Sequence, residues 1–157
     1  MVQTIETNIK EIKSQTGPVK AVIMGAGNRT NVYSAYAIEH PADLQIVGVV
    51  EPDSLRRNNA AKKFNIPTER CFESIEAFIK TPKFADAVIN GTMDEIHVET
   101  TIPVLKAGYD VLLEKPIGVA EQEILELNEV AAQYNRKVMI CHVLRYAPFY
   151  KEIKEEY

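Results

Sequence analysis

The chain has 157 residues, of which 46% are hydrophobic and 25% are charged, and its formal net charge is −4. This length and composition are typical of one soluble globular domain and leave too few residues for two such domains. The acidic balance disfavours a nucleic-acid partner, and no apolar run is long enough for a membrane span.

The N-terminal stretch MVQTIETNIKEIK is charged and has no apolar core, so we do not expect a secretory signal peptide. The two cysteines, Cys71 and Cys141, lie far apart in apolar, strand-like runs. We expect buried, reduced thiols and no metal site, because no cluster of further ligands accompanies either cysteine. Reduced thiols favour a cytoplasmic location.

Hydrophobic periodicity predicts strands and helices that alternate along the chain. A short amphipathic helix is expected over residues 5–14, and a Gly-Pro pair ends it. The predicted strands are 19–24, 44–50, 71–72, 85–89, 109–113 and 137–141. The predicted helices that follow the lead-in are 31–39, 54–64, 75–79, 97–107, 121–134 and 149–157.

The strands read as nearly continuous apolar runs, such as AVIM, IVGVV and VMI. Such runs are typical of parallel strands that helices cover on both faces. Strands separated by helices and joined by right-handed crossovers predict an α/β fold with a doubly wound parallel sheet, the Rossmann fold. Ligands of such sheets bind beyond the carboxyl ends of the strands, so the residues there are the functional candidates.

The first strand ends in a Gly-Ala-Gly turn with Gly25 and Gly27, directly before a helix. The first glycine allows a tight turn, and the second lets the backbone approach a pyrophosphate that the helix N-terminus attracts. Thr30 replaces the third glycine of this pattern, which we expect to loosen helix packing more than binding. Asn28 and Thr30 are N-cap candidates, and Thr30 could also contact a phosphate oxygen. Arg29 could lie beside the phosphates or point into solvent.

An acidic residue, Glu51, ends the second strand at about the distance from the glycines that a dinucleotide-binding pattern requires. It could accept hydrogen bonds from an adenosine ribose, and capping of the next turn is the alternative. A carboxylate here repels a 2′-phosphate, which favours NAD over NADP, although Arg56 and Arg57 weaken that preference. Arg56 is a further candidate for cofactor contact.

Three further strand ends carry longer motifs: TMDEIH (92–97), GYDVLLEKP (108–116) and HVLRY (142–146). They resemble the glucose–fructose oxidoreductase/inositol dehydrogenase (Gfo/Idh/MocA) family. The first is similar to its T-P-D-x-x-H segment, with Met93 in place of the proline, and the second to its G-x-x-V-x-x-E-K-P strand. The third is similar to the end of its sixth strand. The resemblance covers about residues 18–150, and the E-K-P triplet is its most specific part.

The resemblance implies an oxidoreductase that transfers a hydride between NAD, or NADP, and a sugar, cyclitol or related polyol. It also implies a second, C-terminal α/β domain and assembly of the full-length protein as a homo-oligomer. We therefore expect a lead-in at 1–17, the Rossmann domain at 18–147 and a connection at 148–157 to a domain that this chain lacks. We favour a truncated, inactive piece over a lone nucleotide-binding protein. A redox-neutral NAD-dependent glycosidase and a non-catalytic dinucleotide-sensing regulator remain alternatives.

The resemblance further assigns roles to single residues. Lys115 is the predicted catalytic residue, because it could exchange a proton with a substrate hydroxyl, and its bond to Pro116 is expected to be cis. Glu114 would face the nicotinamide ribose or hold Lys115 in place, with a salt bridge to a helix as the plainer alternative. Thr92 and His97 would lie near the ribose and pyrophosphate.

Several of these assignments keep an open alternative. For His97 it is a purely local hydrogen-bonding role, and for Asp94 it is capping of the next helix. The predicted substrate residues are His142, Arg145 and Tyr146. The tyrosines at 33 and 36 lie at helical spacing, and we expect them to be packing residues.

Overall fold

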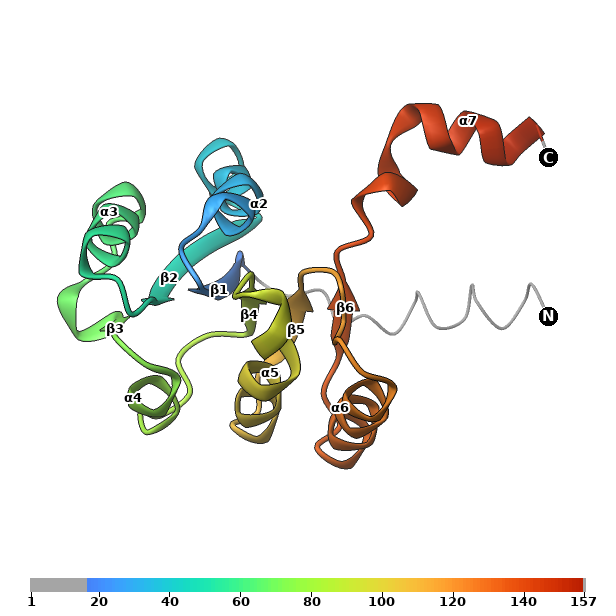
Figure 1. Cartoon of the computed structure of the whole chain (residues 1–157). Coiled ribbons are helices and arrows are strands. Elements are labelled where there is room, and N and C mark those ends of the chain that lie inside the picture. The colour runs from blue at the N-terminus through green and yellow to red at the C-terminus, as the bar shows by residue number, and fades with distance from the viewer. Residues whose placement is uncertain (1–16, 157) are drawn as a thin grey trace.

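The computed structural model describes residues 17–156 and contains one sheet of parallel strands with helices on both faces (Figure 1). The strands are β1 (Val19–Met24), β2 (Leu44–Val50), β3 (Cys71–Phe72), β4 (Ala87–Asn90), β5 (Asp110–Leu113) and β6 (Val138–Ile140). Their order in the sheet is β3-β2-β1-β4-β5-β6, and every neighbouring pair is parallel. This order confirms the doubly wound Rossmann fold and places its topological switch between β1 and β4.

Six α-helices and three short 3-10 helices complete the described part of the chain. The α-helices are α2 (Asn28–Glu39), α3 (Ser54–Phe64), α4 (Ile75–Ile79), α5 (His97–Lys106), α6 (Glu121–Gln133) and α7 (Pro148–Glu156). The 3-10 helices are η1 (Thr68–Arg70), η2 (Asp94–Ile96) and η3 (Val143–Tyr146).

Local sequence sets the ends of several helices. The Asp53 carboxylate accepts the Arg56 N–H at 2.8 Å and caps the start of α3, and the Ser74 hydroxyl caps α4 in the same way at 3.2 Å. Asn65 ends α3 in the left-handed region with a φ of 54°, which asparagine tolerates better than most residues. These caps explain why the predicted and observed bounds of α3 and α4 agree.

Helices α2 and α3 cover one face of the sheet, and α4, α5 and α6 cover the other (Figure 1). Successive residues of β1 point to opposite faces, so Ala21 and Ile23 pack on one side while Val22 and Met24 pack on the other. All four are almost completely buried. Complete burial of one large aliphatic side chain contributes about 1.5–3 kcal/mol, so the two apolar layers hold the sheet and its helices together.

The observed elements differ from the predicted ones mainly at their ends. The helix expected over 31–39 begins at Asn28, and the strand expected over 85–89 is Ala87–Asn90. The helix expected over 5–14 lies outside the described residues. Cys141 is buried as expected, but Cys71 is only half-buried, because β3 is a two-residue edge strand.

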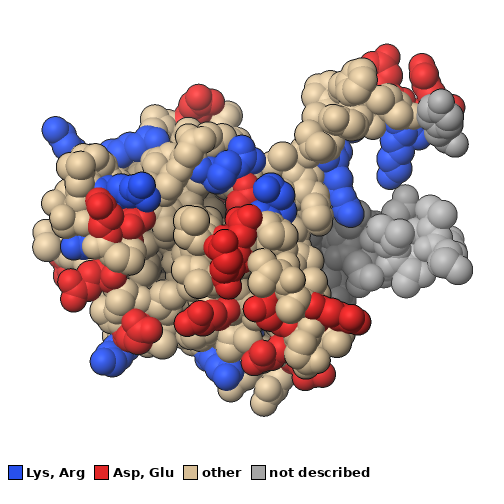
Figure 2. All heavy atoms as spheres, in the orientation of Figure 1, with Lys and Arg blue, Asp and Glu red and all other residues tan. Residues whose placement is uncertain are grey.

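Helix α7 extends away from the sheet, beyond η3 (Figure 1). Figure 2 shows basic side chains mostly over α2 and α3 and acidic side chains mostly over α5 and α6. In the described part of the chain, none of the helices has the length and hydropathy of a membrane span. Nor do residues 17–156 bring three potential metal-binding side chains together.

Candidate functional site

The carboxyl ends of β1, β2, β4 and β5 bring four predicted clusters to one edge of the sheet. The glycine turn follows β1, Glu51 follows β2, Thr92 follows β4, and the Glu114-Lys115 pair follows β5. Because β1 and β4 are the strands at the topological switch, these clusters border the crevice where doubly wound folds bind ligands.

The glycine turn uses its two glycines differently. Gly25 has a φ of 78°, and a Cβ added there would lie 2.7 Å from the Gly91 carbonyl oxygen, so only glycine fits. Gly27 is the N-cap of α2, and within the described residues no atom lies within 4 Å of an added Cβ. The Asn31 side chain fixes the turn by donating to the Ala26 carbonyl at 3.1 Å and the Gly27 carbonyl at 2.8 Å. The start of α2 is therefore open to an anion.

Helix α2 starts earlier than the sequence predicts, which changes the roles of two residues. Since Gly27 is the N-cap, Asn28 and Thr30 lie inside the first turn, and the capping role expected for them is wrong. Thr30 is completely buried, and its side chain fills the space that Gly91 leaves by having no side chain. The close packing of Thr30 on Gly91 is contrary to the expected loosening of the helix, and the Thr30 hydroxyl is buried there without a hydrogen-bond partner among the described residues.

Glu51 is buried, with 6% of its surface exposed, and its carboxylate links the β1 and β2 turns. Oε2 accepts the Ala26 N–H at 2.7 Å, and Oε1 accepts the Asp53 N–H at 3.0 Å. The Arg57 guanidinium donates to the carbonyls of Glu51 and Pro52 and so braces the same turn. Arg56 is exposed, and its backbone N–H is the one that Asp53 caps.

Glu114 is the second buried carboxylate of this edge, with 5% of its surface exposed. Oε1 accepts from Arg29 Nε at 2.7 Å and from the Tyr33 hydroxyl at 2.8 Å. Oε2 accepts the N–H of Lys115 at 2.7 Å. Arg29 Nη2 and the Tyr33 oxygen lie 2.7 Å apart, which closes the cluster.

These contacts shift the pKa values of two groups. Burial raises the pKa of Glu114, but the hydrogen bonds from Arg29, the Lys115 N–H and Tyr33 together hold it below its usual range. Burial and the hydrogen bond to Glu114 raise the pKa of Tyr33 to about 12. At neutral pH the cluster thus contains a carboxylate, a guanidinium and a neutral phenol.

The cluster gives two residues contacts that the sequence did not predict. Arg29 stays 46% exposed at the start of α2, and its Nε donates to Glu114 Oε1, a partner that neither expectation for this residue included. Tyr33 packs against an apolar cluster of the core as expected, and its hydroxyl also hydrogen-bonds within the site, a role that sequence reasoning missed. The signal that could have found it is the spacing of Arg29 and Tyr33, which puts both on one helix face.

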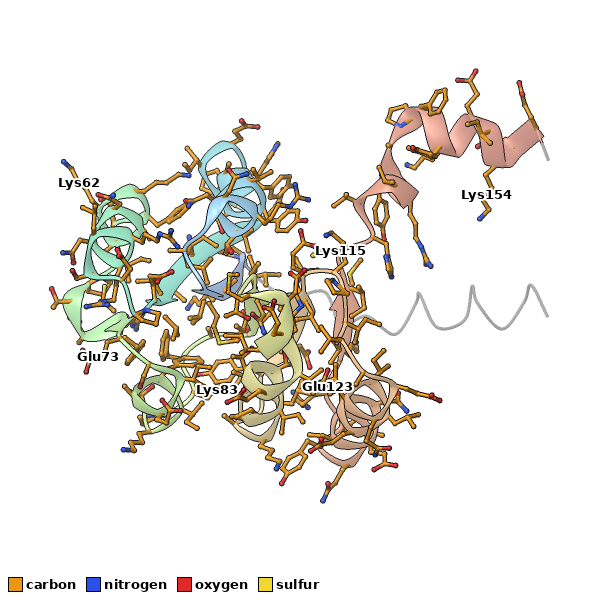
Figure 3. All side chains as sticks on the ribbon, in the orientation of Figure 1. Lys62, Glu73, Lys83, Lys115, Glu123 and Lys154 are labelled. Atoms are coloured by element: carbon orange, nitrogen blue, oxygen red, sulfur yellow. The ribbon has the colours of Figure 1, made fainter. Side chains whose placement is uncertain are left out.

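The Lys115 side chain is exposed, and Figure 3 places it where β5 and β6 end. Hydrogen bonds hold the backbone on both sides of it: Glu114 accepts the Lys115 N–H, and His97 contacts the Pro116 carbonyl. The peptide bond from Lys115 to Pro116 is cis, which confirms the prediction. On the far side of this bond, the Pro116 carbonyl accepts from His97 Nδ1 at 2.6 Å. His97 Nε2 lies 3.3 Å from the Thr92 carbonyl, and the ring is completely buried. The contacts of His97 are therefore those of the local hydrogen-bonding role.

A buried amide, Asn90, organises the end of β4 and was missed by the sequence reasoning. Its Oδ1 accepts from the Thr92 N–H at 3.1 Å and the Thr92 hydroxyl at 2.8 Å. Its Nδ2 donates to the hydroxyls of Thr100 and Thr101, both at 2.9 Å. Asp94 is exposed in η2, and the N-cap of α5 is Ile96 with no side-chain hydrogen bond, so the capping alternative for Asp94 is wrong.

The three predicted substrate residues follow β6 and are all exposed. His142, Arg145 and Tyr146 line one hollow of about 370 Å³ together with side chains of β6. The Cys141 N–H donates to the Leu113 carbonyl at 2.9 Å, so the segment after β6 starts beside Glu114 and Lys115. The structure thus brings these residues together on the β6 side of the site.

Residues 19–142 match a family described as an oxidoreductase family with an NAD-binding Rossmann fold, the Gfo/Idh/MocA family. The chain belongs to this family. It is 29% identical over 133 residues to trans-1,2-dihydrobenzene-1,2-diol dehydrogenase of Xenopus tropicalis, a match that covers 84% of this chain and 39% of that protein. It is 26% identical over 142 residues to inositol 2-dehydrogenase of Corynebacterium glutamicum, which covers 90% of this chain and 40% of that protein.

Among solved structures, the scyllo-inositol dehydrogenase of Lactobacillus casei with bound NAD(H) and scyllo-inositol superposes with a TM-score of 0.79. The match has 22% sequence identity and covers 88% of this chain and 40% of that one, and it shows the shared fold. The chain thus spans about two fifths of the length of these similar proteins.

Proposed function

We propose that this chain is the coenzyme-binding part of an NAD-dependent oxidoreductase that transfers a hydride between nicotinamide and a sugar, cyclitol or related polyol. The observation that carries the proposal is the convergence of the glycine turn, Glu51 and Lys115 at one sheet edge, in a member of a dinucleotide-binding family. Both relatives named above are dehydrogenases, one of a diol and one of inositol.

The start of α2 fits the diphosphate of the coenzyme. Gly27 leaves the approach to the helix N-terminus open, and among the described side chains none caps that turn. Backbone N–H groups at a helix N-terminus, together with the helix dipole, attract a negative charge. Figure 2 shows the α2–α3 side to be the more basic part of this face, which favours the same ligand.

The end of β2 fits an adenosine ribose without a 2′-phosphate. Both Glu51 oxygens already accept one backbone N–H, and each carboxylate oxygen can accept a further hydrogen bond, for example from a ribose hydroxyl. The negative charge repels a phosphate at that position. The Arg57 guanidinium donates to backbone carbonyls and Arg56 is exposed, so their charges reduce this repulsion, but the buried carboxylate lies closest to the ribose position and we propose NAD as the preferred coenzyme.

Lys115 is the residue that we expect to exchange a proton with the substrate hydroxyl. NAD, when bound, supplies the hydride acceptor, and the protein must then stabilise the substrate hydroxyl and exchange its proton. Lys115 is exposed at the end of β5 and carries three N–H donors for a hydroxyl oxygen. His142, Arg145 and Tyr146 would contribute polar contacts to a polyol from the adjacent hollow. Substrate identity, homo-oligomeric assembly and a cytoplasmic location stay predictions.

Calorimetric titration with NAD⁺ and NADP⁺ tests the proposal. We expect NAD⁺ to bind more tightly than NADP⁺, and Glu51→Ala to weaken NAD⁺ binding by about 1–2 kcal/mol through the lost charged hydrogen bond. Glu129→Ala, on the exposed face of α6, is the matched control and should leave binding unchanged. A folded chain that binds neither coenzyme, or a Glu51→Ala variant with unchanged affinity, would overturn the proposal.

A further inference from the structure

We propose that Arg29 and Tyr33 are positioning residues that hold Glu114 and, through its bond to the Lys115 N–H, set the place of Lys115 beside the nicotinamide half of the coenzyme. This inference rests on the proposed function and goes beyond it, because it assigns two residues of the first helix to the nicotinamide end. Neither residue would touch the diphosphate that this helix attracts.

The position of the cluster in the sheet supports this role. Arg29 and Tyr33 lie on α2, which follows β1, whereas Glu114 and Lys115 follow β5. Strand β4 lies between β1 and β5, so the bond from Arg29 to Glu114 crosses the switch point of the sheet. The cluster therefore connects the element that binds one half of a dinucleotide to the residue expected at the other half.

The identity of Arg29 is unfavourable for the helix itself. A positive side chain in the first turn of a helix meets the positive end of the helix dipole, and acidic residues are the ones that stabilise this turn. Helix α2 has no acidic residue there. The Arg29 guanidinium is compensated by Glu114 at 2.7 Å, a residue from the other half of the sheet. The arginine thus serves the tertiary contact with Glu114 and not the stability of α2.

The Glu114 carboxylate accepts from three donors, two on one oxygen and one on the other. The Arg29 and Tyr33 donors fix Oε1, which leaves Oε2 directed at the Lys115 N–H. His97 holds the other end of the segment through the Pro116 carbonyl. The backbone of Lys115 is thus held before and after the residue, while its side chain stays exposed. Loss of the donors to Oε1 would weaken the hold on the Lys115 N–H.

Binding measurements with NADH and with ADP-ribose, which lacks the nicotinamide ring, test the inference. We expect Arg29→Gln and Tyr33→Phe to weaken NADH binding to the 157-residue chain by about five- to tenfold, as expected for hydrogen bonds to a charged group, and to leave ADP-ribose binding within about twofold. Tyr36→Phe and Arg136→Gln are the matched controls. Tyr36 bonds Asp43 from the same helix, and Arg136 pairs with Asp110 at the opposite edge of the sheet. Both controls should bind each ligand like the native chain.

Double variants show whether Arg29 affects coenzyme binding through Lys115 or by touching the coenzyme itself. If Arg29 acts by positioning Lys115, Arg29→Gln should add less than about twofold to the loss of NADH affinity that Lys115→Ala causes alone. Full additivity of the two losses would overturn the inference. Equal weakening of NADH and ADP-ribose, or unchanged NADH binding in both single variants, would overturn it as well.

A measurement without coenzyme keeps this inference separate from the proposed function. After reductive ¹³C-methylation, the dimethylamine resonance of Lys115 can be assigned by its loss in Lys115→Arg. We expect this resonance to shift in Arg29→Gln and Tyr33→Phe and to stay in place in Tyr36→Phe. A native chain that binds neither NADH nor ADP-ribose would refute the proposed function, whereas an unmoved Lys115 resonance would refute the positioning role.

Discussion

Two buried carboxylates lie at the same edge of the sheet and are held in opposite ways. Glu51 accepts two backbone N–H groups, from Ala26 and Asp53. Glu114 accepts two side-chain donors, from Arg29 and Tyr33, and a single backbone N–H. The adenosine end of the proposed site therefore depends on the path of the backbone, and the nicotinamide end depends on the identity of distant side chains.

This difference determines which substitutions each end tolerates. Backbone donors persist under most side-chain changes but are lost when the chain is forced into another conformation. A side-chain donor is lost when a substitution removes a single polar atom, while the backbone around it stays in place. Strain in the glycine turn should therefore damage the Glu51 end most, and conservative polar changes should damage the Glu114 end.

The largest effect on stability is expected from Gly25→Ala, which strains the backbone at the Glu51 end. A φ of 78° and a Cβ only 2.7 Å from the Gly91 oxygen should reduce the free energy of unfolding by about 3 kcal/mol. Urea denaturation followed by circular dichroism measures it. Gly27→Ala is the matched control, since its Cβ would meet none of the described atoms within 4 Å, and it should change stability by less than about 0.5 kcal/mol. Equal losses in the two variants would contradict the assigned geometry.

A smaller effect is expected from Glu114→Gln, which keeps the shape of the side chain and removes its charge. Three donors would lose a charged acceptor, and we expect the free energy of unfolding to fall by about 2 kcal/mol. Glu126→Gln, on an exposed position of α6, should be nearly neutral in the same urea experiment. If both variants unfold at the same urea concentration, the side-chain donors do not stabilise the nicotinamide end.

The smallest expected effect is the change with pH in the stability that Glu114 contributes at the nicotinamide end. Because the pKa of Glu114 is lowered in the folded protein, its contribution is complete above the pKa of an unfolded glutamate, about 4.3, and is lost as the pH falls through the folded value. The stability difference between the native chain and Glu114→Gln should therefore be constant from pH 7 to 5 and shrink below about pH 4. A difference that persists unchanged at pH 3 would contradict the lowered pKa.

The sequence predicted most of the fold because its signals are local. Apolar runs gave the bounds of β1, β2 and β3, and hydrophobic periodicity gave the starts of α3 and α4, where the structure shows Asp53 and Ser74 as caps. The start of α2 was placed three residues late because Asn28 and Thr30 were taken as N-cap candidates, whereas the N-cap is Gly27. The helix begins at once after Gly27, where the backbone is still extended.

The side-chain contacts of the site could not be predicted, because their partners are distant in sequence. Tyr33 lies 81 positions from Glu114, and although its spacing from Arg29 puts both on one helix face, the sequence does not show which carboxylate they share. Thr30 fits against the sheet only because Gly91, at the end of another strand, has no side chain. The motif around Lys115 did identify its segment and its cis bond, since that motif is specific by itself.

The most direct test of the central claim is an amide chemical-shift titration of the ¹⁵N-labelled chain with NAD⁺. The account predicts saturable shifts concentrated in residues 25–31, 51–57, 90–97 and 114–116, with little change on the outer faces of α3 and α6. Saturable shifts confined to any other surface, with these four segments unmoved, would contradict the assignment of this sheet edge as the dinucleotide site.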